Sequence, residues 1–294
     1  MATVPVYKVR NATKHDIPAI KAFCDSEKWD VDTKYLQCMF DMDSRGWFVA
    51  ESESGEVIGL RVLEHYDENT TAGGMYIVKK ELRGMGIGHA VNSAALSAVG
   101  DTNVVLAATN VNLYNTQGFT YDCDSYERRG SASVIMAALP EDQTDKEITI
   151  MPYEDSMLSE LMAYDRSICE FERSYFFQNW IIKHTKAIVV ARSSSGVIAG
   201  YGCLRYSDYG DQVAPLYAEK DVIAWSLMRA LLENVDPNLA VKLFIPSGNK
   251  PMFERIGRLS LEDISTTYRM YRTKRLPSSL DKVFSLTFWG LTII

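Results

Sequence analysis

The hydrophobic and polar positions in the first half of the chain alternate between strand-like and helix-like segments. Thr13 and Asp16 are typical of a helix start, because the apolar residues after them recur at the spacing of one helical face. The pattern predicts strands over Val6–Arg10, Trp47–Glu51, Val57–Leu63 and Met75–Val78, and helices from Thr13, around Thr33–Met42 and from Gly88 to about Val99. The first half is therefore predicted to be an α/β unit.

The same order of segments returns after a polar, charged stretch, Leu139–Lys146, which is the best candidate for a linker. The pattern predicts strands over Ile148–Met151, Ala187–Arg192, Val197–Tyr206, Gln212–Tyr217 and Ala240–Ile245, and helices across Met157–Trp180 and over Asp221–Leu232. We interpret this repetition of element order as an internal duplication, and we expect one domain over residues 1–140 and another over residues 147–294.

Composition and charge narrow the class of protein. Hydrophobic residues make up 47% of the chain and charged residues 23%, the ordinary balance of a folded globular protein. The net charge is −7, and the whole acidic excess lies before the predicted second domain. An acidic surface disfavours binding to nucleic acid, whose phosphates need a basic face. It favours a cationic small molecule or peptide, or it is simply a solvated surface.

The ends of the chain and its cysteines bear on location and metal binding. Lys8, Arg10 and Lys14 interrupt the N-terminus, which does not resemble a secretion signal. The apolar run Val283–Ile294 is shorter than the roughly 20 residues of a membrane span, so we expect it to pack back onto the fold or onto a partner. The five cysteines lack the spacing of zinc or redox motifs. We therefore expect a cytoplasmic protein with no membrane segment and no metal.

A glycine-rich turn carries the clearest chemical signal. The predicted strand Met75–Val78 is followed by Arg83-Gly84-Met85-Gly86-Ile87-Gly88 and then by a helix rich in small residues. The first amides of a helix have no internal partners, so a turn without side-chain bulk lets a phosphate group approach them. The spacing matches neither a dinucleotide fingerprint nor a Walker loop. Taken alone, the turn is equally well explained as a tight connection.

The surrounding motifs favour the phosphate interpretation. Arg83, Gly86 and Gly88 match the Arg/Gln-x-x-Gly-x-Gly/Ala signature, so the first half resembles the GNAT N-acetyltransferase family. Further matches in the same order are Arg10-Asn11-Ala12-Thr13, Val57-Ile58-Gly59 and Leu113-Tyr114-Asn115-Thr116-Gln117-Gly118-Phe119. The resemblance implies an α/β fold with two tandem GNAT-like lobes, each a mixed, mostly antiparallel sheet flanked by helices.

The resemblance also implies a function and its residues. It implies an acetyl-CoA-dependent N-acetyltransferase in which an amine of a small molecule or peptide attacks the thioester directly, without a metal. It assigns the cofactor site to Tyr76, Ile77, Val78, Arg83, Gly84, Met85, Gly86, Ile87, Gly88, His89 and Asn110. It assigns Tyr114 as the acid that protonates the departing CoA thiolate, a step for which a phenol is suited because its pKa of about 10 lies near that of a thiol.

Two details of the first half remain open. Many family members carry an asparagine seven residues before this tyrosine, where Ala107 stands, so we expect a shortened helix around Tyr114. The base that deprotonates the amine matches no motif, and the candidates at the acceptor side are Glu64, His65 and Asp67. By resemblance, the acceptor groove is lined by a segment that contains Asp25, Glu27, Asp30, Asp32, Asp41 and Asp43, although an exposed helix face explains these acids as well.

The second half contains Tyr201-Gly202, Pro215-Leu216-Tyr217-Ala218 and Met252-Phe253. By these motifs it resembles the C-terminal half of tandem GNAT proteins, among them bacterial YitH-like acetyltransferases and nematode proteins of unassigned substrate. Ala218-Glu219-Lys220-Asp221 stands where the glycine turn would be, and its two carboxylates repel a pyrophosphate, so we expect one cofactor site per chain. Its aromatic residues, Phe171, Tyr175, Phe176, Phe177 and Trp180, are explained as core or as a ligand cage. The alternative functions are an inactive CoA-binding sensor or scaffold, an enzyme with another acyl donor or an alcohol acceptor, and an interaction protein. No pattern indicates the oligomeric state.

Overall fold

A computed structural model of the protein describes residues 4–140, 145–169, 171–257, 259–276 and 279–287. The chain divides into two compact units, unit 1 up to Leu106 and unit 2 from Ala107 onward. The centre of the predicted linker, residues 141–144, lies outside the described residues. The domain bounds 1–140 and 147–294 therefore stay a prediction, and each unit is described below by itself.

Unit 1 is a mixed, mostly antiparallel sheet. Its strands are β1 (Tyr7–Asn11), β2 (Gly46–Ser52), β3 (Val57–His65), β4 (Thr70–Val78) and the first part of β5 (Asn103–Ala108). They lie side by side in this order, antiparallel from β1 to β4, and β5 joins β4 in parallel. Strand β4 begins at Thr70, five residues before the predicted start at Met75. The prediction missed this first half because it has no alternating pattern and contains Gly73 and Gly74.

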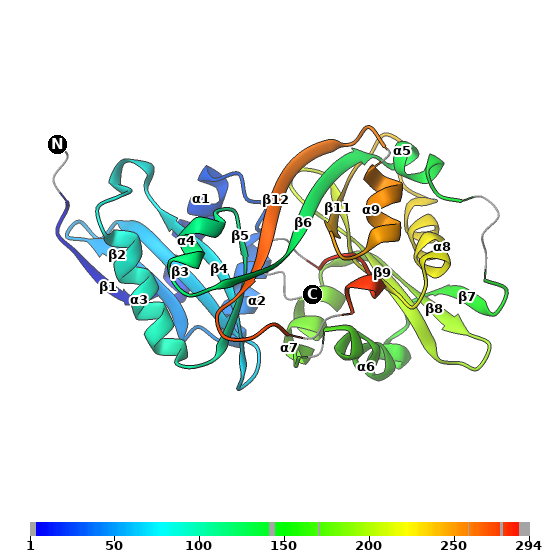
Figure 1. Ribbon diagram of the computed structural model, residues 1–294, viewed down its shortest axis with the longest axis horizontal. Helices are drawn as coiled ribbons and strands as arrows, with labels where there is room; N and C mark the ends of the chain where they lie inside the picture. The colour runs from blue at the N-terminus through cyan, green and yellow to red at the C-terminus, as the bar shows by residue number, and fades with distance from the viewer. Residues whose placement is uncertain (1–3, 141–144, 170, 258, 277–278, 288–294) are drawn as a thin grey trace. The chain divides into compact units, whose positions relative to one another are not determined.

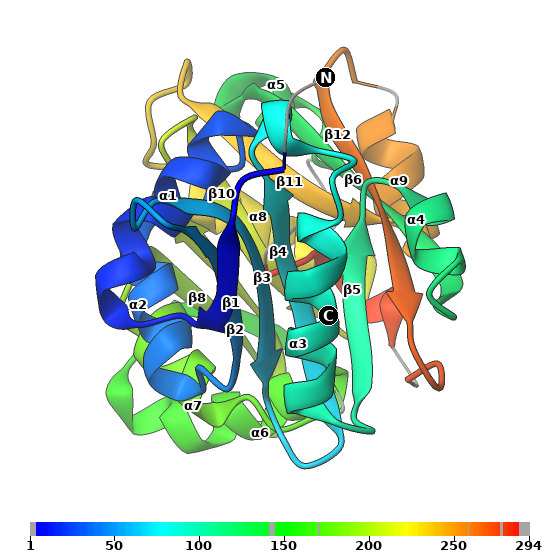
Figure 2. The same ribbon diagram turned by 90° about the vertical axis from the view of Figure 1, so that its left-hand side faces the viewer.

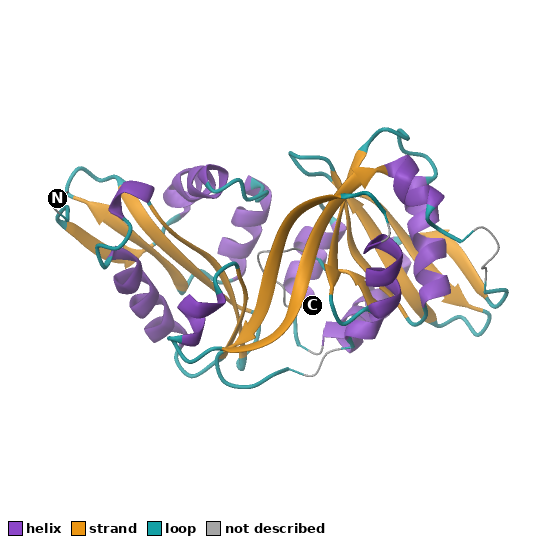
Figure 3. Ribbon diagram, turned by 45° about the horizontal axis from the view of Figure 1, so that its top comes forward, coloured by secondary structure: helices purple, strands orange, loops and turns teal. Residues whose placement is uncertain are grey.

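Helices cover both faces of this sheet. Helices α1 (Ile17–Ser26) and α2 (Thr33–Met42) lie on one face and α3 (Ile87–Val99) on the other (Figures 2 and 3). The side chain of Asp32 caps α2 by accepting a hydrogen bond from the Tyr35 amide, which explains why the helix starts at its predicted position. On α3, Ile87, Val91 and Ala95 recur every fourth residue and are fully buried against the sheet.

Unit 2 is a larger sheet of the same kind (Figure 1). Its helices are α4 (Val111–Asn115), α5 (Ala132–Ala137), α6 (Leu158–Cys169), α7 (Ser174–Phe176) with a π-helical continuation Phe177–Ile182, α8 (Asp221–Leu232) and α9 (Lys250–Gly257). Its strands are β6 (Thr120–Ser131), β7 (Ile148–Pro152), β8 (Thr185–Ser193), β9 (Ile198–Arg205), β10 (Asp211–Ala218), β11 (Ala240–Pro246), β12 (Glu262–Tyr271) and β13 (Val283–Ser285). The strand order is β12-β6-β11-β10-β9-β8-β7, and β13 pairs with β10. Helices α5, α8 and α9 pack on one hydrophobic core.

The strand register confirms the internal duplication. In unit 1, β3 and β4 pair Leu60 with Ile77 and Glu64 with Ala72, and between these pairs β4 carries one extra residue, a β-bulge at 74–75. In unit 2, β9 and β10 pair Tyr201 with Tyr217 and Arg205 with Gln212, with the same extra residue at 214–215. Positions in the two units therefore correspond one to one along these strands.

A buried polar network lies in the core of unit 2. Arg173 and Asp165 form a bidentate ion pair with side-chain exposures of 3% and 2%. The Tyr201 hydroxyl donates to Asp165 over 2.5 Å, and Arg173 donates to the Thr287 hydroxyl over 3.1 Å. Burial of so many polar groups is tolerated because each has a partner. The network ties the segment after β13 to α6.

We expect the Arg173–Asp165 pair to matter for stability far more than a surface pair on the same segment. Arg173→Ala leaves Asp165 buried without its counter-charge and should lower the free energy of unfolding by about 3–5 kcal/mol. Arg166→Ala, which breaks the exposed pair with Glu172, should cost about 0–1 kcal/mol. Urea unfolding of both variants measures the difference, and equal losses would contradict this interpretation.

Candidate functional site

The edge of β4 in unit 1 opens into a gap. The parallel ladder between β4 and β5 runs from the pair Thr70–Asn103 to the pair Gly73–Leu106 and stops there. Beyond it, β4 continues to Val78 while its pairing with β3 on the other side remains intact. The backbone of residues 74–78 therefore presents hydrogen-bonding groups toward the gap, within the part of unit 1 that the structure describes. We call these residues the open edge of β4.

A glycine loop joins this edge to α3. A short 3-10 turn follows β4, and the Arg83 guanidinium donates from Nε to the Val78 carbonyl over 3.0 Å, which fixes the turn. Gly84 and Gly86 adopt the left-handed conformation, with φ of +80° and +85°, and a Cβ at either position would meet no atom within 4 Å. Among the described residues, no side chain caps the start of α3. The loop thus exposes the first amides of a 13-residue helix to an anion.

Packing explains why the second part of the signature also needs a glycine. A Cβ on Gly88 would lie 3.0 Å from the Tyr76 hydroxyl oxygen, because the Tyr76 ring crosses the first turn of α3. The Arg61 guanidinium lies 5.2 Å from the centre of the same ring, and it donates to the Gly74 carbonyl over 2.5 Å. Tyr76 and Arg61 therefore hold the bulge of β4 against the start of α3. The residues predicted for the cofactor, from Tyr76 to His89, thus run from the end of β4 through the glycine loop into α3, with the Ile77 and Ile87 side chains buried, and their assignment to a cofactor stays a prediction.

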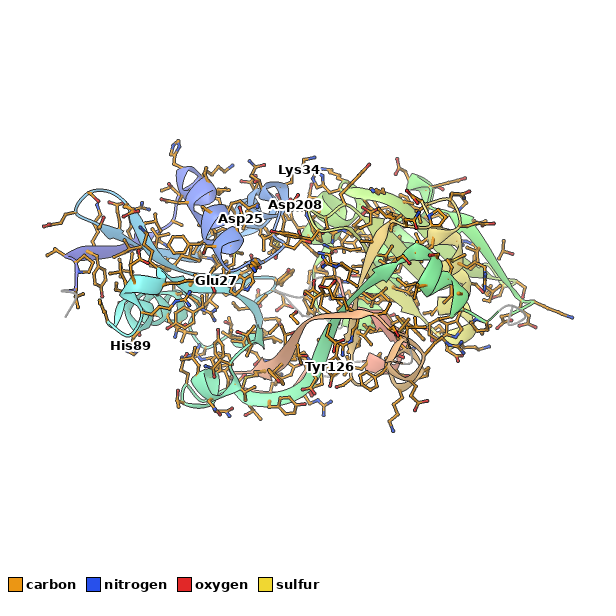
Figure 4. The ribbon with its side chains drawn as sticks, turned by 90° about the horizontal axis from the view of Figure 1, so that it is seen from above. Asp25, Glu27, Lys34, His89, Tyr126 and Asp208 are labelled. Atoms are coloured by element: carbon orange, nitrogen blue, oxygen red, sulfur yellow. The ribbon has the colours of Figure 1, made fainter. Side chains whose placement is uncertain are left out.

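The far side of the turn after β4 borders a pocket. This pocket has a volume of about 410 Å³ and lies between α1, the start of β3 and the segment Val78–Glu81. Glu27, at the end of α1, lines it and accepts a hydrogen bond from Arg83 over 2.6 Å. Figure 4 shows Asp25 and Glu27 at the end of α1 and His89 at the start of α3. The pocket combines an apolar wall from α1 with a charged rim.

Most of the acids between residues 25 and 43 have structural partners. Asp32 caps α2, as described above. Ion pairs join Asp25 to Lys21, Glu27 to Arg83, Asp41 to Lys14 and Asp43 to Arg45. Burial of Asp43 opposes its ionisation, but hydrogen bonds from Arg45 outweigh this and lower its pKa. Structural roles therefore account for these acids without a substrate.

The three candidate bases have different surroundings. Asp67 accepts hydrogen bonds from the amides of Asn69 and Thr70 and so stabilises the turn between β3 and β4. Nδ1 of His65 lies 3.1 Å from the Thr71 hydroxyl, and burial lowers the pKa of its imidazole. Glu64 is fully buried, and burial raises the pKa of its carboxyl group well above the ordinary value. Glu64 is thus the one of the three whose side chain is fully buried.

Tyr114 and Asn110 lie in unit 2, and their assignment to the cofactor site stays a prediction. Helix α4 spans five residues, so the expected shortening is confirmed, and Asn110 caps it by accepting from the Leu113 amide over 3.2 Å. The Tyr114 ring is mostly buried and packs edge-to-face on Phe119, with 5.5 Å between ring centres. The two aromatic residues of this motif, Tyr114 and Phe119, therefore pack directly against each other.

In unit 2 the chain itself fills the position of the open edge. Within the described residues, strands β10 and β11 pair in parallel only at their starts, from Asp211–Val241 to Gln212–Lys242, and then diverge like β4 and β5. Strand β13 pairs there with β10, Leu216 opposite Ser285 and Tyr217 opposite Val283. On its other side, the Leu286 amide donates to the Phe244 carbonyl of β11 over 2.8 Å. The described part of the C-terminal apolar run thus packs onto the fold, as predicted.

The other features of the glycine loop and its surroundings are also absent from the described part of unit 2. The bulge of β10 contains Pro215, which has no N–H group, where β4 has the bulge residue Met75. Helix α8 begins at Asp221, whose carboxylate accepts a hydrogen bond from the Val222 amide over 2.8 Å and so lies in the first turn. Glu219 pairs with Lys282, just before β13. The helix start is therefore already occupied by negative charge, which disfavours a phosphate.

Comparison with known proteins identifies the family. A family model described as an acetyltransferase (GNAT) domain matches residues 43–121, and a second model with the same description matches residues 161–285. The chain therefore belongs to the GNAT acetyltransferase family and carries two of its domains in tandem. Enzymes of this family take an acyl group from an acyl-CoA donor, so the protein is an acyltransferase.

Individual relatives agree with this assignment. Holothin acyltransferase of Pseudoalteromonas sp. (strain SANK 73390) is 22% identical over 262 residues, which cover 88% of this chain and 85% of the relative. A putative acetyltransferase from Pyrococcus horikoshii has a TM-score of 0.76 at 15% identity, covering 97% of this chain and 95% of its own. A tandem GNAT protein from the clavulanic acid biosynthesis pathway has a TM-score of 0.64 at 11% identity, covering 90% and 98%. The two solved structures show the same fold.

Two absences can be stated for the described residues. No helix in this part of the chain has both the length and the apolar character needed to cross a membrane. No three side chains of His, Cys, Asp or Glu in the same ranges come together as ligands for a metal ion.

Proposed function

We propose that unit 1 binds acetyl-CoA and that the protein transfers the acetyl group to an amine of a small molecule or peptide. One observation carries the proposal: in unit 1 an open strand edge leads directly into an uncapped, glycine-lined helix start. The strand edge offers hydrogen bonds to the amide-rich pantetheine arm, and the helix start offers amides to the pyrophosphate. The acetyl group is chosen over longer acyl groups by resemblance to acetyltransferases.

The contrast between the units supports a single donor site per chain. The corresponding strand edge of unit 2 is covered by β13, and Asp221 places a carboxylate in the first turn of the corresponding helix. A second acyl-CoA would have to displace β13 and approach a carboxylate. The acyltransferase name of the relative from Pseudoalteromonas supports acyl transfer, and the acceptor of this chain is left to an amine screen.

Calorimetric titration with acetyl-CoA tests this proposal. We expect one binding event per chain, lost in Gly86→Glu because the new side chain brings bulk and negative charge to the pyrophosphate position. Gly196→Glu is the matched control, since Gly196 has the same φ of +85° and equally open surroundings in a turn of unit 2. Both variants carry a similar backbone strain of about 1–2 kcal/mol. Two sites per chain, or binding retained in Gly86→Glu, would sink the proposal.

Tyr114 is proposed as the acid that protonates the CoA thiolate. Tyr114→Phe should lower kcat by about 10²-fold or more while the Kd for acetyl-CoA stays unchanged, because the ring remains and the proton donor is lost. Tyr121→Phe serves as control, since it removes an exposed hydroxyl that bonds Asp124. Release of the CoA thiol across an amine panel gives kcat. Unchanged turnover in Tyr114→Phe removes the assignment, and a wild type that binds acetyl-CoA but turns over no amine favours the inactive sensor.

A further inference from the structure

Glu64 occupies a distinctive place on the sheet of unit 1. It lies on β3 opposite Ala72 of β4, and the neighbouring pair is Leu63 with Gly73. Gly73 is also the last β4 residue paired with β5, so Glu64 stands at the level where the gap begins. This position is on the strand adjacent to the open edge of β4, close to where a donor thioester would enter.

The surroundings of Glu64 are unusual for a structural carboxylate. Its exposed fraction is 0%, and within the described residues neither carboxylate oxygen accepts a hydrogen bond of good geometry. Burial is the larger influence on its pKa and raises it, while an interaction with the Tyr35 hydroxyl from α2 lowers it in part. Structural carboxylates in protein cores are normally paired, as Asp165 is with Arg173 in unit 2. Within the described ranges, the Tyr35 hydroxyl is therefore the polar group that acts on Glu64, and no cation balances its charge as Arg173 balances Asp165.

The duplicated unit supplies an internal comparison. By strand register, the position of Glu64 corresponds to Arg205, which pairs with Gln212 as Glu64 pairs with Ala72. The Arg205 guanidinium lies 3.1 Å from the centre of the Trp180 ring. An arginine stays protonated in proteins and cannot accept a proton. The unit whose gap is filled by β13 thus carries, at this position, a group that is unable to act as a base.

We propose that Glu64 is the group that accepts the proton of the attacking amine, directly or through one water molecule. This inference rests on the proposed function. The nitrogen lone pair forms the bond to the thioester carbon, the carbon–sulfur bond breaks, and the amine proton passes to a Glu64 carboxylate oxygen. The CoA thiolate takes its proton from Tyr114. Solvent then returns a proton from Glu64 to Tyr114, so the amide and the CoA thiol are the net products.

The raised pKa fits this role. A carboxylate with an ordinary pKa is a weak base toward an amine, and desolvation strengthens it. Burial provides this desolvation at Glu64, and no cation in the described part of the chain offsets it. Ionised Glu64 therefore lowers the free energy of unfolding, because a carboxylate is solvated less well in the core than in the unfolded chain.

The test compares the wild type with Glu64→Gln, which keeps the shape of the side chain and removes the base. Acetyl-CoA is the donor, and the probes are a panel of primary alkylamines and water itself, followed by CoA thiol release. We expect the same Kd for acetyl-CoA and a loss of about 10²-fold or more in turnover near neutral pH. The loss should shrink as pH rises, because more of the amine is then already neutral. A structural defect would not recover in this way.

Thermal melting provides the folding control. A group whose pKa is raised on folding destabilises the protein above its unfolded pKa and has no effect below it. Glu64→Gln should therefore melt at or above the temperature of the wild type at neutral pH, and the two should converge in acid. Glu64→Asp, which keeps a shorter carboxylate, should recover part of the activity.

Each outcome decides the matter. Unchanged turnover in Glu64→Gln, or loss of acetyl-CoA binding in that variant, overturns the role of Glu64 and leaves the donor site standing. A wild type that binds acetyl-CoA but releases no CoA to any amine or to water also overturns it. A wild type that does not bind acetyl-CoA removes the proposed function and this inference together.

Discussion

Backbone hydrogen bonding at a diverging pair of parallel strands is the constraint on which both units depend. When two such strands separate, the amides and carbonyls that face the gap lose their partners, and they must find others or meet solvent. In unit 2 the chain itself supplies these partners, because β13 enters the gap and pairs with β10. Unit 1 leaves residues 74–78 of β4 open toward its gap. The two units therefore differ in whether their own chain covers this strand edge, and the open edge of β4 is the place where we propose that a ligand binds.

The two units show how a duplicated fold changes its chemistry while its geometry is kept. Pairings across β3–β4 and β9–β10 correspond residue by residue, including the position of the bulge. The differences fall on side chains and on single backbone atoms. Pro215 removes an amide, Asp221 occupies a helix start, and Arg205 replaces a carboxylate. None of these changes disturbs the hydrogen-bonded frame, which explains how the fold tolerates them.

Local signals in the sequence predicted the local parts of this structure well. Helix α2 and helix α8 begin and end where the pattern places them, because capping by Asp32 and dense apolar spacing are local properties. The glycine loop was also recognised, since its left-handed glycines leave a mark in the sequence. Pro215 is visible in the sequence as well, but its effect on the strand edge could not be predicted without knowing that it lies in the bulge of β10.

The parts that escaped prediction depend on distant pairings. Strands β6 and β12 pair with each other across a long sequence separation, and no local pattern announces such a partner. The run that contains β13 was expected to pack onto the fold or onto a partner, but its place between β10 and β11 follows only from the three-dimensional arrangement. The burial of Glu64 belongs to the same class, because an acidic residue next to a histidine at a strand end gives no sign of it.

The pairing of β6 has a consequence for the order in which the protein is built. Strand β6 lies between β11 and β12, and both flanking strands come from much later in the chain. During synthesis, β6 therefore leaves the ribosome long before either neighbour exists, with both of its edges unpaired. Unpaired strand edges are the surfaces through which nascent chains associate wrongly. Unit 1 contains its own partners up to Leu106, so it is the unit equipped to fold first, and unit 2 is the one whose assembly a chaperone would need to protect.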